Sequence, residues 1–140
     1  MAFTGNFTCN TFKTGLMNGT FNFTSGSFYL ALYTNSASLN EDTTAYTATG
    51  EASGGNYVAG GNLLTIAQVP TVGNGDTAFI SFNNTSWTGA ITARGALIYL
   101  SGGGNPAVCV LDFGADKTST ATFTVQFPAV TNTSAIIRIS

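Results

Sequence analysis

Apolar and polar residues alternate along several short stretches of the chain, most regularly over residues 122–127. Phe123, Val125 and Phe127 occupy every second position there, with threonine and glutamine between them. Because successive side chains of a β-strand point to opposite faces, this alternation predicts a strand with one buried face. Pro128 follows directly and predicts the end of that strand.

A second stretch, residues 28–33, is apolar or aromatic at every position and reads FYLALY. An unbroken run of this kind is typical of a strand whose two faces are both covered. We therefore expect a central strand at residues 28–33.

One short helix is predicted near the N-terminus, between Thr8 and Gly19. Phe12 and Leu16 are four residues apart, so they would share one face of a helix. Thr8 or Asn10 supplies a polar start, and Gly19 stands where a helix would end.

Short apolar segments separated by turn-forming Gly, Asn and Asp residues make up most of the remaining chain. They predict strands at residues 57–59, 63–69, 78–82, 85–88, 91–100, 107–113, 122–127 and 135–139. The connections are hairpin-sized, which favours antiparallel pairing over helical crossovers. The predicted fold class is all-β, an antiparallel β-sandwich of the jelly-roll type with about eight strands and one short N-terminal helix. Residues 1–140 are expected to form a single domain, because no repeat or linker divides them.

Residues 35–55 lack such periodicity and hold three of the six carboxylates. Thr, Ser, Asn and Ala predominate there. We expect a long exposed connection with at most a short strand.

The composition limits the possible functions, because the chain has no histidine, four basic and six acidic residues and a net charge of -2. Nucleophilic catalysis that relies on a histidine base is therefore excluded in its usual forms. The cations are too few for the basic stripe that nucleic acids require; they are Lys13, Arg94, Lys117 and Arg138. The sequence also lacks an apolar leader and a membrane-length segment. We expect a soluble protein made in a cytoplasm, with no nucleic-acid partner and no membrane insertion.

Paired carboxylates, as in glycosidases, are the remaining formal route to catalysis. Asp112 and Asp116 form one candidate pair, and Glu41 and Glu51 form another. A structural role is favoured for the first pair, because Asp112 begins the turn-like sequence DFGADK and Asp116 lies beside Lys117 in what should be a solvated loop. Calcium could use the two aspartates, but the spacing of an EF-hand is missing. We predict no catalytic, cofactor-binding or metal-binding residue.

Arg94 is the one charged residue in an otherwise uncharged strand-like stretch, residues 91–100. An unpaired guanidinium is costly when it is buried. We expect a carboxylate to pair with it, and Asp112 or Asp116 would be nearest in the predicted hairpin. The alternative is that Arg94 lies at a sheet edge and contacts water.

The two cysteines, Cys9 and Cys109, could in principle form one disulfide. Cys109 lies in the apolar sequence AVCVL, so a free and buried thiol is the favoured prediction. Trp87 and the tyrosines could stack against sugar rings, but packing in the core is favoured for aromatics on strand-like segments. Asn-x-Ser/Thr sequences occur at six positions and are attributed to the abundance of Asn and Thr; they begin at Asn6, Asn18, Asn22, Asn83, Asn84 and Asn132.

Several colinear segments resemble one family of viral proteins. They are TARGALIY at residues 92–99, AVCVLDFGADK at 107–117, FTVQFP at 123–128 and the C-terminal AIIRIS. FKTGLMNG, FYLALYTNSASL, TTAYT and NYVAGGNLL fit the same pattern. Through these segments the sequence resembles small virion proteins of tailed bacteriophages, including phages of cyanobacteria, that act as capsid decoration or cement proteins. Cys109 departs from the small residue, such as alanine, that the pattern would have there.

The resemblance implies a β-sandwich that forms a homotrimer on the outer capsid surface of the virion and touches several copies of the major capsid protein. The expected function is structural and not enzymatic, and the resemblance brings no cofactor and no functional side chain. Related sandwiches also form the tips of tail fibres or spikes, so a module that binds host-surface glycan is the alternative. A fibre tip is usually joined to a long shaft, and the 140 residues from Met1 contain none, which favours decoration.

Overall fold

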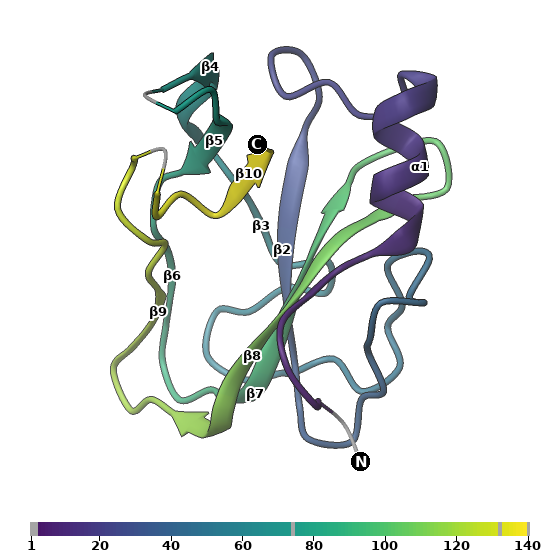
Figure 1. The fold of residues 1–140 in the computed structure, drawn as a ribbon. Coiled ribbons are helices and arrows are strands. Elements are labelled where there is room, and N and C mark those ends of the chain that lie inside the picture. Colours follow the sequence, from purple (N-terminus) through teal and green to yellow (C-terminus); the bar gives the residue numbers. More distant parts are fainter. Residues whose placement is uncertain (1–2, 74, 132, 140) are drawn as a thin grey trace.

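The structure is a computed structural model that describes residues 3–73, 75–131 and 133–139. Within these ranges the chain forms ten strands and one helix, and every strand pairing is antiparallel. The largest sheet has five strands in the order β1-β8-β7-β2-β3 (Figure 1). Their bounds are β1 Phe7–Thr8, β8 Ala107–Thr118, β7 Thr92–Leu100, β2 Phe28–Tyr33 and β3 Asn62–Leu63.

Two smaller sheets lie together on one side of the five-stranded sheet (Figure 1). One has the strand order β10-β5-β4, and the other pairs β6 with β9. Their bounds are β10 Ile137–Ile139, β5 Ala78–Phe82, β4 Ile66–Val72, β6 Thr85–Thr88 and β9 Thr122–Val125. The main hydrophobic core lies between the two layers, since Leu30 and Ile98 of the large sheet belong to one buried cluster with Phe82, Trp87 and Phe123 of the small sheets. The predicted all-β class with antiparallel sheets is confirmed.

The N-terminal helix is also confirmed, as α1 (Asn10–Asn18). Phe12 is buried on its inner face, and Gly19 ends the helix in the left-handed conformation at φ 83°. The helix has no side-chain cap at its start, where Cys9 precedes it. Among the described residues no helix has the length and apolar character needed to cross a membrane.

Strand β2 is covered on both faces, as the unbroken apolar run predicts. Leu30 and Leu32 pack into the core between the layers. Ala31 and Tyr33 point to the opposite face and belong to a second cluster. We call this second face of the five-stranded sheet the outer face.

Most predicted strands are present, but the bounds of two of them need correction. Residues 78–82 and 85–88 coincide with β5 and β6, and residues 91–100, 122–127 and 135–139 contain β7, β9 and β10. The segment predicted at 63–69 is divided, because β3 ends at Leu63 in the large sheet and β4 begins at Ile66 in a small one. The predicted strand 107–113 is too short, because pairing with β7 extends β8 as far as Thr118.

The strand predicted at residues 57–59 is wrong. The Tyr57 hydroxyl binds the Leu32 amide and the Glu51 carboxylate. The chain then turns through two glycines with positive φ, Gly60 and Gly61. A Cβ at Gly61 would lie 1.8 Å from the carbonyl oxygen of Leu30, so the backbone passes β2 more closely than any side chain would allow.

Residues 35–55, in the connection between β2 and β3, contain no named strand, which agrees with the prediction of at most a short one, but their predicted exposure is wrong in part. Ala37 and Leu39 are buried against the outer face, where they join Tyr33 and Leu97. Ala52 is buried too, but in the main core between the layers. Burying Ala37 and Leu39 gives the connection a structural role, which is to cover the outer face of the large sheet.

Candidate functional site

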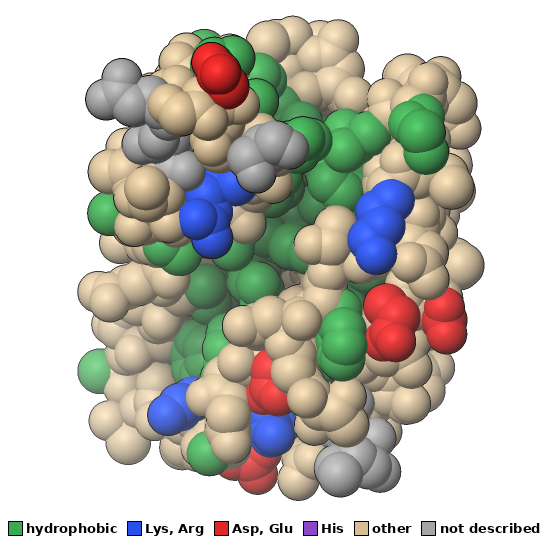
Figure 2. Space-filling model, viewed as in Figure 1, with side chains coloured by type: hydrophobic (Ala, Val, Ile, Leu, Met, Phe, Trp, Pro, Cys, Tyr) green, Lys and Arg blue, Asp and Glu red, His purple; other side chains and the backbone are tan. Residues whose placement is uncertain are grey.

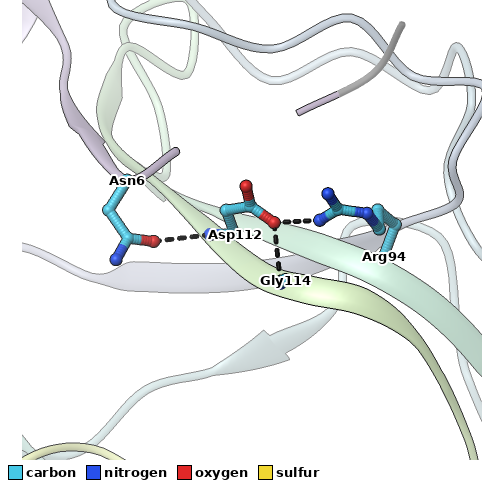
Figure 3. Close-up of polar contacts among 4 residues, drawn as sticks. All are labelled: Asn6, Arg94, Asp112 and Gly114. Carbon is cyan, nitrogen blue, oxygen red and sulfur yellow. Dashed lines mark hydrogen bonds and ion pairs between the residues drawn. The ribbon is translucent and has the colours of Figure 1, made fainter. Parts of the chain in front are cut away.

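Arg94 and Asp112 form an ion pair between adjacent strands (Figure 3). Gly95 of β7 faces Asp112 of β8, and the register shifts just beyond this pair, so the neighbouring arginine reaches across to the carboxylate. Only 17% and 13% of the Arg94 and Asp112 side chains are exposed, so the two charges are largely withdrawn from water. The predicted pairing of Arg94 is confirmed, with Asp112 as its partner.

The N-terminal segment completes this cluster. The amide of Asp112 donates to Asn6 Oδ1 at 2.6 Å, and the amide of Gly114 donates to the Asp112 carboxylate at 2.8 Å (Figure 3). The Arg94 guanidinium lies 5.8 Å from the centre of the Phe3 ring, a cation–π arrangement. The acid, the cation and the segment 3–6 therefore fasten the start of the chain to the sheet.

The predicted surroundings of the two aspartates need correction. Both lie in β8 and neither in a turn or loop, because β7 continues to pair with β8 as far as Thr92 opposite Thr118. The Asp112 carboxylate binds Arg94 and the amide of Gly114, whereas Asp116 is exposed beyond the register shift. Within the described ranges no hydrogen bond or ion pair joins Asp116 to the cluster. The two aspartates therefore do not form a joint site, and Asp112 has a structural role.

Glu51 is the centre of a second polar cluster, one that the sequence analysis missed. Its carboxylate accepts hydrogen bonds from the hydroxyls of Tyr46 and Tyr57, each at 2.6 Å, and from the amide of Gly60 at 2.7 Å. The Tyr57 hydroxyl in turn accepts a bond from the amide of Leu32 in β2 at 2.9 Å. The connection over the outer face is therefore tied to itself and to the sheet through one carboxylate.

The tyrosines of this cluster are held in their neutral form. Burial, followed by the hydrogen bond to Glu51, raises the pKa of Tyr57 and of Tyr46 well above the usual range. Burial likewise raises the pKa of Tyr99 to about 12. The Tyr99 hydroxyl donates to the Gly60 carbonyl at 2.6 Å, which links β7 to the same turn.

Glu41 and Glu51, the other candidate pair, are used in different places. Glu41 is exposed, and its backbone carbonyl accepts a bond from the amide of Asn10 at the start of α1. Glu51 instead pairs through its backbone with Tyr33 at the end of β2. No periodicity or motif could have identified the role of Glu51, because Tyr46 lies in an aperiodic segment and Tyr57 in a segment whose pattern predicted a strand instead of the observed turn.

The thiols and Trp87 are interior groups. Cys9 and Cys109 are free and buried, as predicted, and burial raises the pKa of Cys9 to about 11 and that of Cys109 to about 12. Trp87 is 2% exposed and packs against Tyr57 with ring centres 5.5 Å apart. It therefore serves the core and offers no surface for a sugar.

The asparagines of the Asn-x-Ser/Thr sequences mostly bond to their surroundings. Asn18 and Asn22 accept bonds from the amides two residues ahead, at Thr20 and Thr24. Such Asx turns give the recurring Asn-x-Thr pattern a local structural role. Asn132 lies outside the described residues.

Within the described part of the chain, no group of three or more His, Cys, Asp and Glu side chains is placed to hold a metal ion. The carboxylates of Asp112 and Glu51 bind groups of the protein itself. Among the described residues, no Asp or Glu lines the clefts of about 670, 490, 280 and 240 Å³.

The surface of the molecule is hollowed along strand β10. A cleft of about 670 Å³ lies between α1, β8 and β10. It joins a cleft of about 280 Å³, with which it shares Ile137 and Ile139, and one of about 240 Å³, with which it shares Ile136 and Arg138. We call the three joined clefts the β10 groove. Figure 2 shows hydrophobic side chains at the bottom of this hollow and basic side chains on both of its sides.

No protein-family model, curated protein or solved structure matches the chain.

Proposed function

We propose that the protein is a noncatalytic structural component of a tailed-phage virion, a decoration or cement protein. It forms a homotrimer on the outer surface of the head and bridges copies of the major capsid protein. The resemblance of its colinear segments to such proteins supplies this hypothesis. We also propose that the two layers of sheet have the connectivity of a jelly roll.

The observation that carries the proposal is the internal use of the reactive side chains. Asp112 is bound by Arg94, Glu51 by two tyrosines and an amide, and Trp87 lies in the core. Each of these groups stabilises the fold. A protein that serves as a clamp needs such a rigid scaffold and an adhesive surface, with no reactive centre.

A trimer that bridges neighbouring capsid subunits would oppose the internal pressure of packaged DNA. Contacts made by three linked subunits act together, so weak individual contacts combine into strong retention. Virions without the protein should therefore release their DNA at a lower temperature than complete virions.

The test is immunogold electron microscopy of intact virions, with an antibody raised against the purified chain. Label distributed over the head is the expected result. Label confined to the tail would replace the proposal with the alternative, a tip module that binds host-surface glycan. Virions without any label would refute both.

A further inference from the structure

The β10 groove is bordered by a strand edge with no partner. Strand β10 ends its sheet and pairs only with β5 among the described strands. Its second edge therefore presents backbone N–H and C=O groups that an added strand could bind. Ile139 of this strand is 54% exposed although it borders an apolar cleft.

Two of the four cations of the chain line the largest cleft of the groove. Lys13 comes from α1 and Arg138 from β10, so they approach it from different elements. Arg94 with Asp112 is the one ion pair within the described residues, and neither groove cation has a carboxylate partner there. Lys13 contacts Asn10 Oδ1 at 3.3 Å, and Arg138 donates to the carbonyl of Thr133.

The groove has apolar and polar parts. Phe12, Val108 and Ile136 line its largest cleft beside threonine and basic side chains, and the smaller cleft, lined by Phe21 and Phe79, is mostly apolar. An occupant that matches both features has apolar side chains and at least one carboxylate. All three clefts are lined by residues 136–139, so the groove follows β10, and a groove along a strand fits an extended polypeptide better than a compact small molecule.

We propose that the β10 groove binds an extended, carboxylate-bearing segment of the major capsid protein, which adds as a strand to the free edge of β10. The identity of the partner rests on the proposed function. The form and charge of the segment rest on the groove. Its apolar side chains cover Ile137 and Ile139, and its carboxylate meets Lys13 and Arg138.

The experiment measures binding of the purified chain to phage heads that lack it, by co-sedimentation over a range of concentrations. Lys13→Glu and Arg138→Glu reverse the two groove charges, and both residues are exposed, so the fold should be kept. Lys117→Glu is the matched control, because it makes the same charge change at an exposed site that does not line the groove. Circular dichroism and light scattering check the fold and the oligomeric state of every variant.

We expect each groove variant to weaken binding about tenfold and the control to stay within about twofold of the unchanged protein. Backbone amides of β10 should also exchange more slowly with solvent in the bound state, as strand addition requires. Binding of the groove variants equal to the control would overturn the groove as the docking site and leave the proposed function standing. Failure of the unchanged chain to bind heads would refute both. Variants that dissociate the oligomer but still bind heads would show that a second copy occupies the groove, which also overturns the inference.

Discussion

The five-stranded sheet has one side that the chain closes and another that it leaves partly open. The connection between β2 and β3 buries Ala37 and Leu39 against the outer face and directs two tyrosine hydroxyls and an amide to the Glu51 carboxylate. Along β10, apolar side chains remain partly exposed and two cations have no carboxylate partner among the described residues. The chain therefore binds the Glu51 carboxylate fully on one side, and on the other it leaves two cations without a carboxylate partner among the described residues.

This difference indicates that one side of the molecule serves folding stability and the other serves binding to a partner. Buried charges and hydroxyls are costly unless they are bonded, so a satisfied network marks a part of the fold that must stay closed. Exposed apolar side chains and cations without a carboxylate partner contribute favourable free energy when a binding partner covers them. We expect changes on the closed side to affect unfolding and changes on the open side to affect binding.

The largest effect on the closed side is expected at alkaline pH. Burial raises the pKa of Tyr99 to about 12, whereas an unfolded tyrosine ionises near pH 10. Between these values the folded protein keeps a proton that the unfolded chain has lost. The stabilisation is complete below about pH 10 and falls by about 1.4 kcal/mol per pH unit for such a tyrosine as the pH rises. Tyr46 and Tyr57 shift in the same direction, so we expect tyrosinate absorbance and loss of circular dichroism to change together. Tyrosinate formation in a chain that stays folded would contradict this prediction.

Removing the Glu51 carboxylate should have the next largest effect. Glu51→Gln keeps the shape but loses charged acceptors for Tyr46 and Tyr57, and should lower the free energy of unfolding by about 2 kcal/mol. Glu51→Ala should cost about 3 kcal/mol, because both hydroxyls then lose their acceptor. Urea unfolding measures both values, with the exposed Glu41→Gln as the control. Equal stability of the Glu41 and Glu51 variants would show that the network does not close the outer face.

The ion pair between Arg94 of β7 and Asp112 in the middle of β8 should contribute less. Arg94→Ala removes the partner of Asp112 and the contact with Phe3, and should cost about 2 kcal/mol. Arg94→Met keeps most of the apolar stem, so we expect a loss of about 1 kcal/mol, and a similar loss for Asp112→Asn. Thermal unfolding of the three variants tests the pairing. Unchanged stability in all of them would mean that the pair is not energetically important.

The smallest effect is expected on the open side. Ile139→Ala should change the free energy of unfolding by less than about 1 kcal/mol, because the side chain is already half exposed. The matched change in the closed core, Ile98→Ala, should cost about 3 kcal/mol, since Ile98 is fully buried. Urea unfolding of the two variants measures the contrast directly. Similar losses would mean that the groove is part of the stabilising core.

Sequence patterns predicted the regular elements well where burial is periodic. The alternation around Phe123 and Val125 and the unbroken run of β2 both correspond to strands. Prediction failed for residues 57–59, where an apolar and aromatic segment turns because Tyr57 bonds to Glu51 and Gly61 approaches Leu30. It also ended β8 early, because the DFGADK sequence resembles a turn but is held in a strand by pairing with β7.

For Arg94 the sequence limited the partner to two residues. The cost of an unpaired guanidinium and the predicted hairpin pointed to Asp112 or Asp116, and the strand register decided for Asp112. The cluster around Glu51 could not be predicted in this way. Its three donors, Tyr46, Tyr57 and Gly60, all come from the connection between β2 and β3, which contains no named strand. The groove was equally hidden, because Lys13 and Arg138 are far apart in sequence and approach one cleft only when α1 and β10 are packed.

The sequence by itself determined most of the strand-forming segments and the position of the helix, favoured free thiols, and limited the carboxylate partner of Arg94 to two aspartates. These follow from alternation, turn chemistry and the cost of isolated charge, which act over short distances or within one hairpin. Only the tertiary structure decided which side of the large sheet is closed by Glu51 and its tyrosines and which keeps an open groove. The reason is physical: closure depends on how layers built from distant segments fit together, and no local pattern encodes that fit.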